Sequence, residues 1–146
     1  MTCWILDTDV LTLFLHGETT VCHRVASVSP DELAVTIITV EEVLTGWYSE
    51  LRRARRDDQL VRAYSTLQQA VEFFRHVQIL PFNEQAAWRF HDLRQQHRRL
   101  GTNDLRIAAI AIEQLGIVVT RNQSDFGVID GLRAGRTDTT ARSQNE

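Results

Sequence analysis

Four short apolar runs, separated from one another by helical patterns, constrain the fold of this chain more than any other feature. The runs are CWIL (3–6), LAVTII (33–38), VQIL (77–80) and IVVT (117–120). Short continuous apolar runs of this kind are typical of strands that are buried on both faces. Strands that alternate with helices predict an α/β domain with a mostly parallel sheet. We therefore expect a three-layer α/β/α sandwich with four or five strands.

Helical patterns fill the segments between these runs. The expected helices cover 8–16, 19–28, 58–75 and 105–115, and a further one is capped by Asn83. Another helix is expected from about Val40 and should break near Gly46, because glycine is unfavourable inside a helix. Gly116 is expected to end the helix 105–115 as its C′ residue. The expected inner face of the helix 58–75 is Leu60, Tyr64, Leu67, Val71 and Phe74.

The length and composition fit a single soluble globular domain. The chain has 146 residues, of which 43% are hydrophobic and 24% charged. Cys3 and Cys22 are too few for a secreted disulfide scaffold, so we expect reduced thiols in a cytoplasmic protein. The N-terminus lacks the basic region and the long apolar stretch of a signal peptide or membrane anchor. We expect a domain over 1–132 and a polar, disordered tail over 133–146.

Acidic residues stand where the predicted strands end. Asp7 ends the first apolar run, Glu42 follows the second, and Asp125 follows the fourth. In open parallel sheets, ligands bind outside the carboxyl ends of the strands, so we expect these three acids at one edge of the sheet. Asp104 opens the helix 105–115 and joins them if that helix begins at the same edge. Such a cluster of carboxylates would repel itself, and Mg²⁺ or Mn²⁺, which prefer oxygen ligands, would resolve that repulsion.

Each acid also has a structural interpretation, which the sequence leaves open. Candidates for helix N-caps are Asp7, Asp9, Asn103 and Asp104. Thr39 and Glu42 have the spacing of a capping box, and Asp125 fits a turn. Capping by itself, however, does not require that helix-starting acids follow strands at one sheet edge.

Other chemistries find little support in the sequence. The five histidines lack metal-ligand spacing, and no glycine-rich phosphate loop is present. All 16 cationic residues are arginine, which binds phosphate bidentately. They include the clusters Arg52, Arg53, Arg55 and Arg56, and then Arg98 and Arg99. From the clusters alone, a solvated helix face is the simpler interpretation.

Three segments resemble the PIN-domain ribonucleases, and more narrowly the VapC-type toxins of bacterial toxin–antitoxin pairs. They are LDTDVL, TVEEVLTG and NDLRIAAIAIEQLGIVVTRNQSDF, and the resemblance spans about residues 4–132. The family's first three acids fall on Asp7, Glu42 and Asp104. Its fourth falls on Asn122 or Asp125, and we favour Asp125. Family members often have a last strand after the position of Gly131-Leu132, where this chain is polar, so the fifth strand stays open.

The resemblance implies an Mg²⁺-dependent endoribonuclease, with Mn²⁺ as an alternative metal. It implies that the four acids Asp7, Glu42, Asp104 and Asp125 hold the metal and carry the catalysis. It further implies an RNA substrate, a homodimer and a cognate antitoxin that keeps the enzyme inactive. The chemistry agrees, because a metal ion activates water for phosphodiester hydrolysis and no protein nucleophile is needed. Arginine side chains would hold the RNA backbone.

Two alternatives belong to other classes. WILDTDVLTL also resembles the opening motif of haloacid-dehalogenase-like phosphatases, in which the first Asp is a nucleophile. That site needs a cationic residue, normally Lys, and this chain has no Lys; Asp125 and Asp130 are also a poor match for the late acid pair. The other alternative is a non-catalytic PIN-like module that binds a partner, against which the intact Asp7, Glu42 and Asp104 argue.

Overall fold

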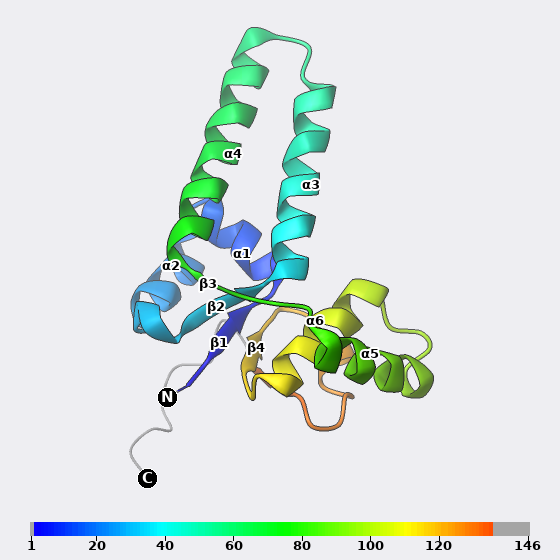
Figure 1. Cartoon of the computed structure of the whole chain (residues 1–146). Coiled ribbons are helices and arrows are strands. Elements are labelled where there is room, and N and C mark those ends of the chain that lie inside the picture. Colours follow the sequence, from blue (N-terminus) through cyan, green and yellow to red (C-terminus); the bar gives the residue numbers. More distant parts are fainter. Residues whose placement is uncertain (1, 136–146) are drawn as a thin grey trace.

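A five-stranded sheet, in which every strand is parallel to its neighbours, forms the centre of the molecule (Figure 1). The structure is a computed structural model that describes residues 2–135. The strands are β1 (Trp4–Leu6), β2 (Leu33–Thr36), β3 (Gln78–Leu80), β4 (Ile117–Val119) and β5 (Arg133–Gly135). Their spatial order is β3-β2-β1-β4-β5. The predicted parallel α/β fold is confirmed, and the fifth strand forms.

Within residues 2–135, seven α-helices and one short 3-10 helix, Pro30–Glu32, connect the strands. The helices are α1 (Thr8–Leu15), α2 (Thr19–Ala26), α3 (Ile37–Arg53), α4 (Asp57–His76), α5 (Glu84–Gln96), α6 (Thr102–Glu113) and α7 (Gln123–Phe126). Helices α3 and α4 form a long hairpin that projects away from the sheet, while α5 and α6 pack together beside it (Figure 1). Within residues 2–135, no helix is long and apolar enough to span a membrane.

Two apolar clusters, one on each face of the sheet, make the three-layer arrangement. Ile5 of β1 and Val118 of β4 belong to the cluster with α5 and α6. The next residue along β1, Leu6, belongs to the cluster with α1 to α4. This split follows from the strand geometry, because successive side chains point to opposite faces. Cys3 packs against the first cluster, and Cys3 and Cys22 are both free thiols, as predicted.

Helix α3 differs from the prediction at its start and in its middle. It begins at Ile37 rather than near Val40, because the Thr36 side chain caps it by accepting a hydrogen bond from the Thr39 backbone N–H at 3.2 Å. It also runs unbroken through Gly46. A glycine costs a helix only about 1 kcal/mol relative to alanine, and the packing of α3 against α4 outweighs that cost.

The buried face of α4 also differs from the prediction. Tyr64 and Val71 were expected inside and are exposed, whereas Ala63 and Ala70 are buried. The helix carries more apolar residues than one face can bury. The alanine side chains and the half-buried Phe73 and Phe74 take the inner positions, which leaves Tyr64 and Val71 on the outside.

The connection from α6 to β4 corrects the expected role of Gly116. Leu115, not Gly116, adopts the left-handed conformation after the helix, with φ of 54°. Gly116 is needed for another reason. A Cβ at this position would lie 2.5 Å from Cδ1 of Ile5 and 3.3 Å from the Cys3 carbonyl oxygen.

Strand β5 lies just beyond residue 132, where the expected domain ends, and it pairs with β4. Arg133, Ala134 and Gly135 align with Ile117, Val118 and Val119 of β4. An edge strand is held by backbone hydrogen bonds along one side, so it needs no apolar run in the sequence. The rest of the predicted tail, 136–146, lies outside the described residues.

Candidate active site at the carboxyl edge of the sheet

The strand order places a ligand-binding edge between β1 and β4. From β1 the chain adds β2 and β3 on one side of the sheet and β4 and β5 on the other. Ligands of open parallel sheets bind outside the carboxyl ends of the strands at such a reversal. Asp7 directly follows β1, and Asp125 lies on α7 after β4. Glu42 lies on α3, which follows β2. Helix α6 leads into the amino end of β4, so its first turn, with Asp104, lies at the opposite, carboxyl edge.

Asp7 is a buried carboxylate with both oxygens occupied. It is 5% exposed. Its Oδ1 accepts a hydrogen bond from the Thr8 backbone N–H at 2.8 Å, and its Oδ2 accepts one from the Thr120 hydroxyl at 2.8 Å. Burial raises the pKa of Asp7 to about 6, although both hydrogen bonds oppose the rise; the charges of Asp104 and Asp9 add to it. The N-cap interpretation is therefore correct for Asp7, but capping does not explain its second hydrogen bond or its burial.

Glu42 is held across two helices by a threonine hydroxyl. Its Oε1 accepts a hydrogen bond from Oγ1 of Thr8 on α1 at 2.8 Å. The Thr8 Oγ1 also lies 3.1 Å from Oγ1 of Thr39. The capping-box interpretation of Thr39 and Glu42 is wrong, because Thr36 is the N-cap of α3. The hydrogen bond from Thr8 instead holds the Glu42 carboxylate next to Thr8, the residue that follows Asp7.

Asp104 has no capping role. The N-cap of α6 is Gly101, which has no side chain to offer, and Asn103 accepts a hydrogen bond from Nη1 of Arg106 at 3.1 Å. Asp104 is half-buried. Burial raises its pKa, and the negative charges of Glu42, Asp125 and Asp9 raise it further. Asp104 is thus the residue at which the acidic charges of this edge converge.

The two candidates for the fourth acidic position are the N-cap of α7, Asn122, and a residue within α7, Asp125, and they are hydrogen-bonded to each other. Oδ2 of Asp125 accepts a hydrogen bond from the Asn122 side-chain amide at 3.0 Å. The Asn122 backbone N–H donates to Oγ1 of Thr120 at 2.9 Å. The turn interpretation of Asp125 is wrong, because Asp125 lies within the short helix α7. Its negative charge adds to the rise in the pKa of Asp104 that burial causes.

Hydroxyl and amide donors, rather than cations, hold Asp7, Glu42 and Asp125. Within residues 2–135, the acids at this edge form no ion pair. Nor do any three His, Cys, Asp or Glu side chains in that part of the chain stand ready to enclose a metal ion. The contacts of Thr8 and Thr120 with the acids were not predicted from the sequence. The available signal was their position, since Thr8 lies between two acids and Thr120 ends the last predicted apolar run.

Comparison with known proteins identifies the family. The PIN domain family model matches residues 4–132. The chain belongs to the PIN-domain family. The predicted family is confirmed, and the haloacid-dehalogenase alternative is wrong as an assignment of this chain. The match covers β1 to β4 and includes every acid described above.

Individual PIN-domain relatives carry VapC names. The chain is 32% identical over 132 residues to Ribonuclease VapC5 of Mycobacterium tuberculosis, covering 87% of each protein. Among solved structures, the DNA-bound VapBC of Salmonella typhimurium is similar with a TM-score of 0.77, 22% identity and coverage of 94% of this chain and 99% of that one. A toxin–antitoxin complex from Klebsiella pneumoniae is similar with a TM-score of 0.61, 25% identity and coverage of 88% and 93%.

The hydrogen bond from Thr120 to Asp7 yields a first prediction. Thr120→Val keeps the shape but removes the donor, so the pKa of Asp7 should rise above about 6. Without added metal, the free energy of unfolding should fall by roughly 1.5–3 kcal/mol at pH 8, where the carboxylate is charged, and by clearly less below pH 5. Urea unfolding at both pH values measures the difference. Thr120→Ser, which keeps the hydroxyl, is the control, and an equal loss at both pH values would contradict the assignment.

Proposed function

We propose that this protein is a metal-dependent endoribonuclease that hydrolyses RNA phosphodiester bonds and serves as the toxin of a toxin–antitoxin pair. The observation that carries the proposal is the convergence of carboxylates on Asp104 beside buried Asp7, at the ligand-binding edge of a PIN fold. The ribonuclease name of the 32% identical relative supports the same activity.

The donor set suits a hard divalent cation. Asp7, Glu42, Asp104 and Asp125 offer carboxylate oxygens, which Mg²⁺ and Mn²⁺ prefer. A bound cation would offset the repulsion from Glu42, Asp125 and Asp9, which adds to the rise in the pKa of Asp104 that burial causes. It would supply an activated water and stabilise charge on the phosphoryl oxygen. In the structure Glu42 accepts a hydrogen bond from Thr8, and Asp125 accepts one from Asn122.

The protein's own groups would divide the remaining work. Hydrogen bonds from the Thr8 backbone N–H and the Thr120 hydroxyl hold the Asp7 carboxylate, so this carboxylate is preorganised for binding. Asp104 is half-buried where the charges of Glu42, Asp125 and Asp9 act on it. It is therefore placed to hold the cation together with these acids and to orient the attacking water.

The proposed role includes two protein partners in the cytoplasm. One is an antitoxin that inserts a basic side chain, such as arginine, among the carboxylates. The name of the Klebsiella pneumoniae complex, a toxin–antitoxin complex, supports such a partner. The other is a second copy of this chain. Apolar side chains exposed on the α3–α4 hairpin, Tyr48, Val61, Tyr64 and Val71, offer surface for a protein contact.

Incubation of the purified chain with a panel of RNAs tests the activity. We expect cleavage with Mg²⁺ or Mn²⁺ and none with a chelator, and we expect growth arrest when the chain is expressed alone. Cleavage that persists in chelator would contradict metal dependence. Release of phosphate from small phosphomonoesters would favour a phosphatase. Antitoxin binding without any cleavage would favour the non-catalytic module.

A further inference from the structure

The loop between α5 and α6, residues 97–101, carries two arginines with free side chains. Arg98 and Arg99 are exposed. In the part of the chain that the structure describes, neither guanidinium makes an ion pair or a hydrogen bond. Two adjacent cationic side chains without acidic partners leave their charge available to an anion from outside the molecule.

Arg94 clamps this loop in place. Its Nη1 donates hydrogen bonds to the carbonyl oxygens of Arg98 at 3.3 Å and Leu100 at 2.9 Å, and its Nη2 donates to Oγ1 of Thr102 at 2.9 Å. The Arg94 guanidinium also lies 5.9 Å from the centre of the Phe90 ring. One side chain thus ties the end of α5 to the first residue of α6. The backbone that carries Arg98 and Arg99 is therefore ordered before any ligand binds, which lowers the entropy cost of binding.

The clamped loop ends beside Asp104. A Cβ built on Gly101 would lie 3.5 Å from Oδ2 of Asp104. Successive Cα atoms are about 3.8 Å apart, so the Cα atoms of Arg99 and Arg98 lie within about 8 Å and about 11 Å of the Gly101 Cα. Both arginines are thus close enough to the acidic edge for one nucleic-acid strand to contact them and Asp104 together.

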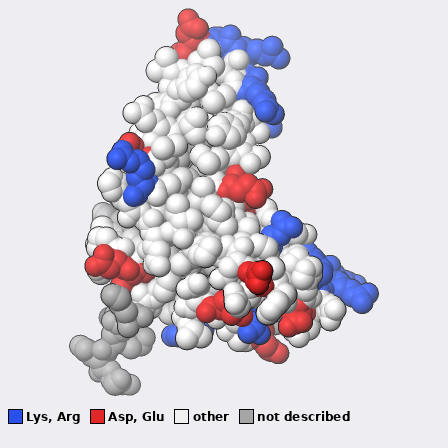
Figure 2. All heavy atoms as spheres, viewed as in Figure 1, with Lys and Arg blue, Asp and Glu red and all other residues white. Residues whose placement is uncertain are grey.

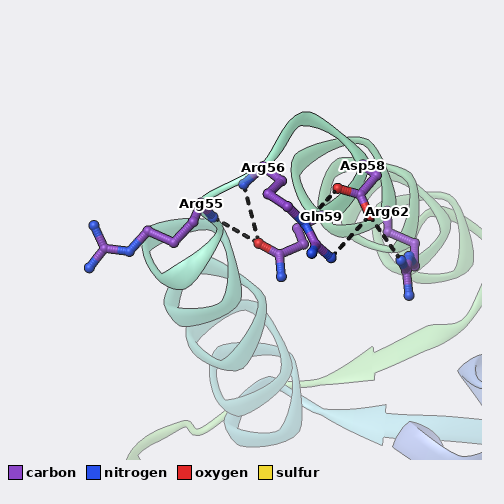
Figure 3. Close-up of polar contacts among 5 residues, drawn as sticks. All are labelled: Arg55, Arg56, Asp58, Gln59 and Arg62. Atoms are coloured by element: carbon purple, nitrogen blue, oxygen red, sulfur yellow. Dashed lines mark hydrogen bonds and ion pairs between the residues drawn. The ribbon is translucent and has the colours of Figure 1, made fainter.

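The second arginine cluster, at the end of the α3–α4 hairpin, is arranged differently. Figure 2 shows arginines at this end and on the lobe that contains α5 and α6, with the outline of the molecule hollowed between them. At the hairpin end, Arg56 and Arg62 share the carboxylate of Asp58 at 3.1 Å and 3.6 Å (Figure 3). Two of the four arginines of this cluster, Arg53 with Glu50 and Arg56 with Asp58, are therefore paired within the molecule.

The hairpin end is also farther from the acids. Arg52 follows Glu42 by ten residues on α3, which corresponds to about 15 Å along the helix axis. Arg55 lies beyond the end of α3, and its guanidinium points away from the other residues drawn in Figure 3. Arg52 and Arg55 are exposed, as Arg98 and Arg99 are, which makes them a matched pair for comparison.

We propose that Arg98 and Arg99, presented by the Arg94-clamped loop, bind phosphate groups of the RNA strand next to the cleavage point. This inference rests on the proposed function for its substrate and adds the residues that hold that substrate. The two guanidinium groups would neutralise backbone phosphates beside the carboxylate cluster, which by itself repels RNA.

Salt dependence tests the proposal. Binding of a short fluorescein-labelled single-stranded RNA to the full chain is followed by anisotropy, without divalent metal, from about 50 to about 200 mM KCl. The double variant Arg98→Gln/Arg99→Gln should bind roughly tenfold more weakly at the low-salt end. The slope of log affinity against log salt should become shallower by about 1.4, because each lost phosphate contact contributes about 0.7 for a single strand.

The matched control is Arg52→Gln/Arg55→Gln, which removes the same charge from exposed positions. We expect its slope to equal that of the parent. An unchanged slope in the Arg98/Arg99 variant, or an equal change in both variants, would overturn the proposal. Cleavage assays separate it from the proposed function. If RNA binding depends on Arg98 and Arg99 but no RNA is cleaved, the role of the loop is supported and the nuclease activity is contradicted. If the parent cleaves RNA and the Arg98/Arg99 variant binds and cleaves it equally well, the nuclease activity is supported and the role of the loop is contradicted.

Discussion

Replacement of Asp104 by asparagine is expected to reduce metal-dependent RNA cleavage by about 100-fold or more while the fold survives. Asp104 makes no capping hydrogen bond in α6, so asparagine removes its charge without removing a structural contact. The charges of Glu42 and Asp125 no longer face a third carboxylate in this variant. The free energy of unfolding without metal should therefore stay the same or rise.

Asp7→Asn and Glu42→Gln should lose activity in the same way. Asparagine is about as good an N-cap as aspartate, and its carbonyl oxygen can still accept from the Thr8 backbone N–H. Glutamine at position 42 can still accept from the Thr8 hydroxyl. Asp125→Asn should have a milder effect, because the other three acids remain.

Cleavage rates with Mg²⁺ and urea unfolding without it measure these variants. Asp130→Asn is the control, since Asp130 is an exposed acid that lies, like Asp125, between β4 and β5. It should behave as the parent does. Near-normal cleavage by the Asp104→Asn protein would refute the four-acid site. Loss of activity together with loss of folding in all three variants would mean that the acids are structural.

A large pH dependence of stability is expected from Asp7. Its pKa is about 6 in the folded chain against 3.8 ordinarily, so the folded state binds this proton more tightly than the unfolded state does. The resulting stabilisation is fully present below about pH 4 and is lost as the pH rises through about 6. For Asp7, the free energy of unfolding falls by about 3 kcal/mol between these two pH limits. Asp104, whose pKa is also raised, lowers the free energy of unfolding in the same direction as the pH rises.

Unfolding in urea at several pH values, with chelator present, measures this loss. The Asp7→Asn variant should show a markedly smaller fall between pH 4 and pH 7. Mg²⁺ should restore stability above pH 6, by about 2.7 kcal/mol at a concentration of 100 times its dissociation constant. A parent protein whose stability rises steadily from pH 4 to pH 7 without metal would show that Asp7 is not a buried, unpaired carboxylate.

The sequence predicted the sheet and the position of the acids well because both are local properties. A short apolar run followed by Asp7, and another followed by Asp125, places the acids at strand ends without knowledge of distant contacts. The position of Asp104 was harder to predict from the sequence. It depends on the direction of α6 relative to β4, which the packing of α5 and α6 onto the sheet determines.

The errors have a common physical origin in tertiary packing. Gly46 has a low helix propensity, yet α3 continues through it because α4 lies alongside. Tyr64 fits the periodic apolar stripe of α4 and is nevertheless exposed, because the closely packed alanines occupy the interface. The threonine contacts were invisible for the same reason, since Thr8 and Glu42 are 34 residues apart in sequence.

Protein engineers commonly replace glycines in loops and keep leucines. At Leu115 and Gly116 the opposite choice is indicated. Leu115 is 83% exposed and holds a left-handed backbone that costs an L-amino acid roughly 1–2 kcal/mol. Glycine at this position would relieve that strain. The neighbouring Gly116 has no positive φ to relieve, and any side chain there would collide with Ile5 of the central strand. A thermostabilisation library for this chain should therefore offer glycine at 115 and hold 116 fixed.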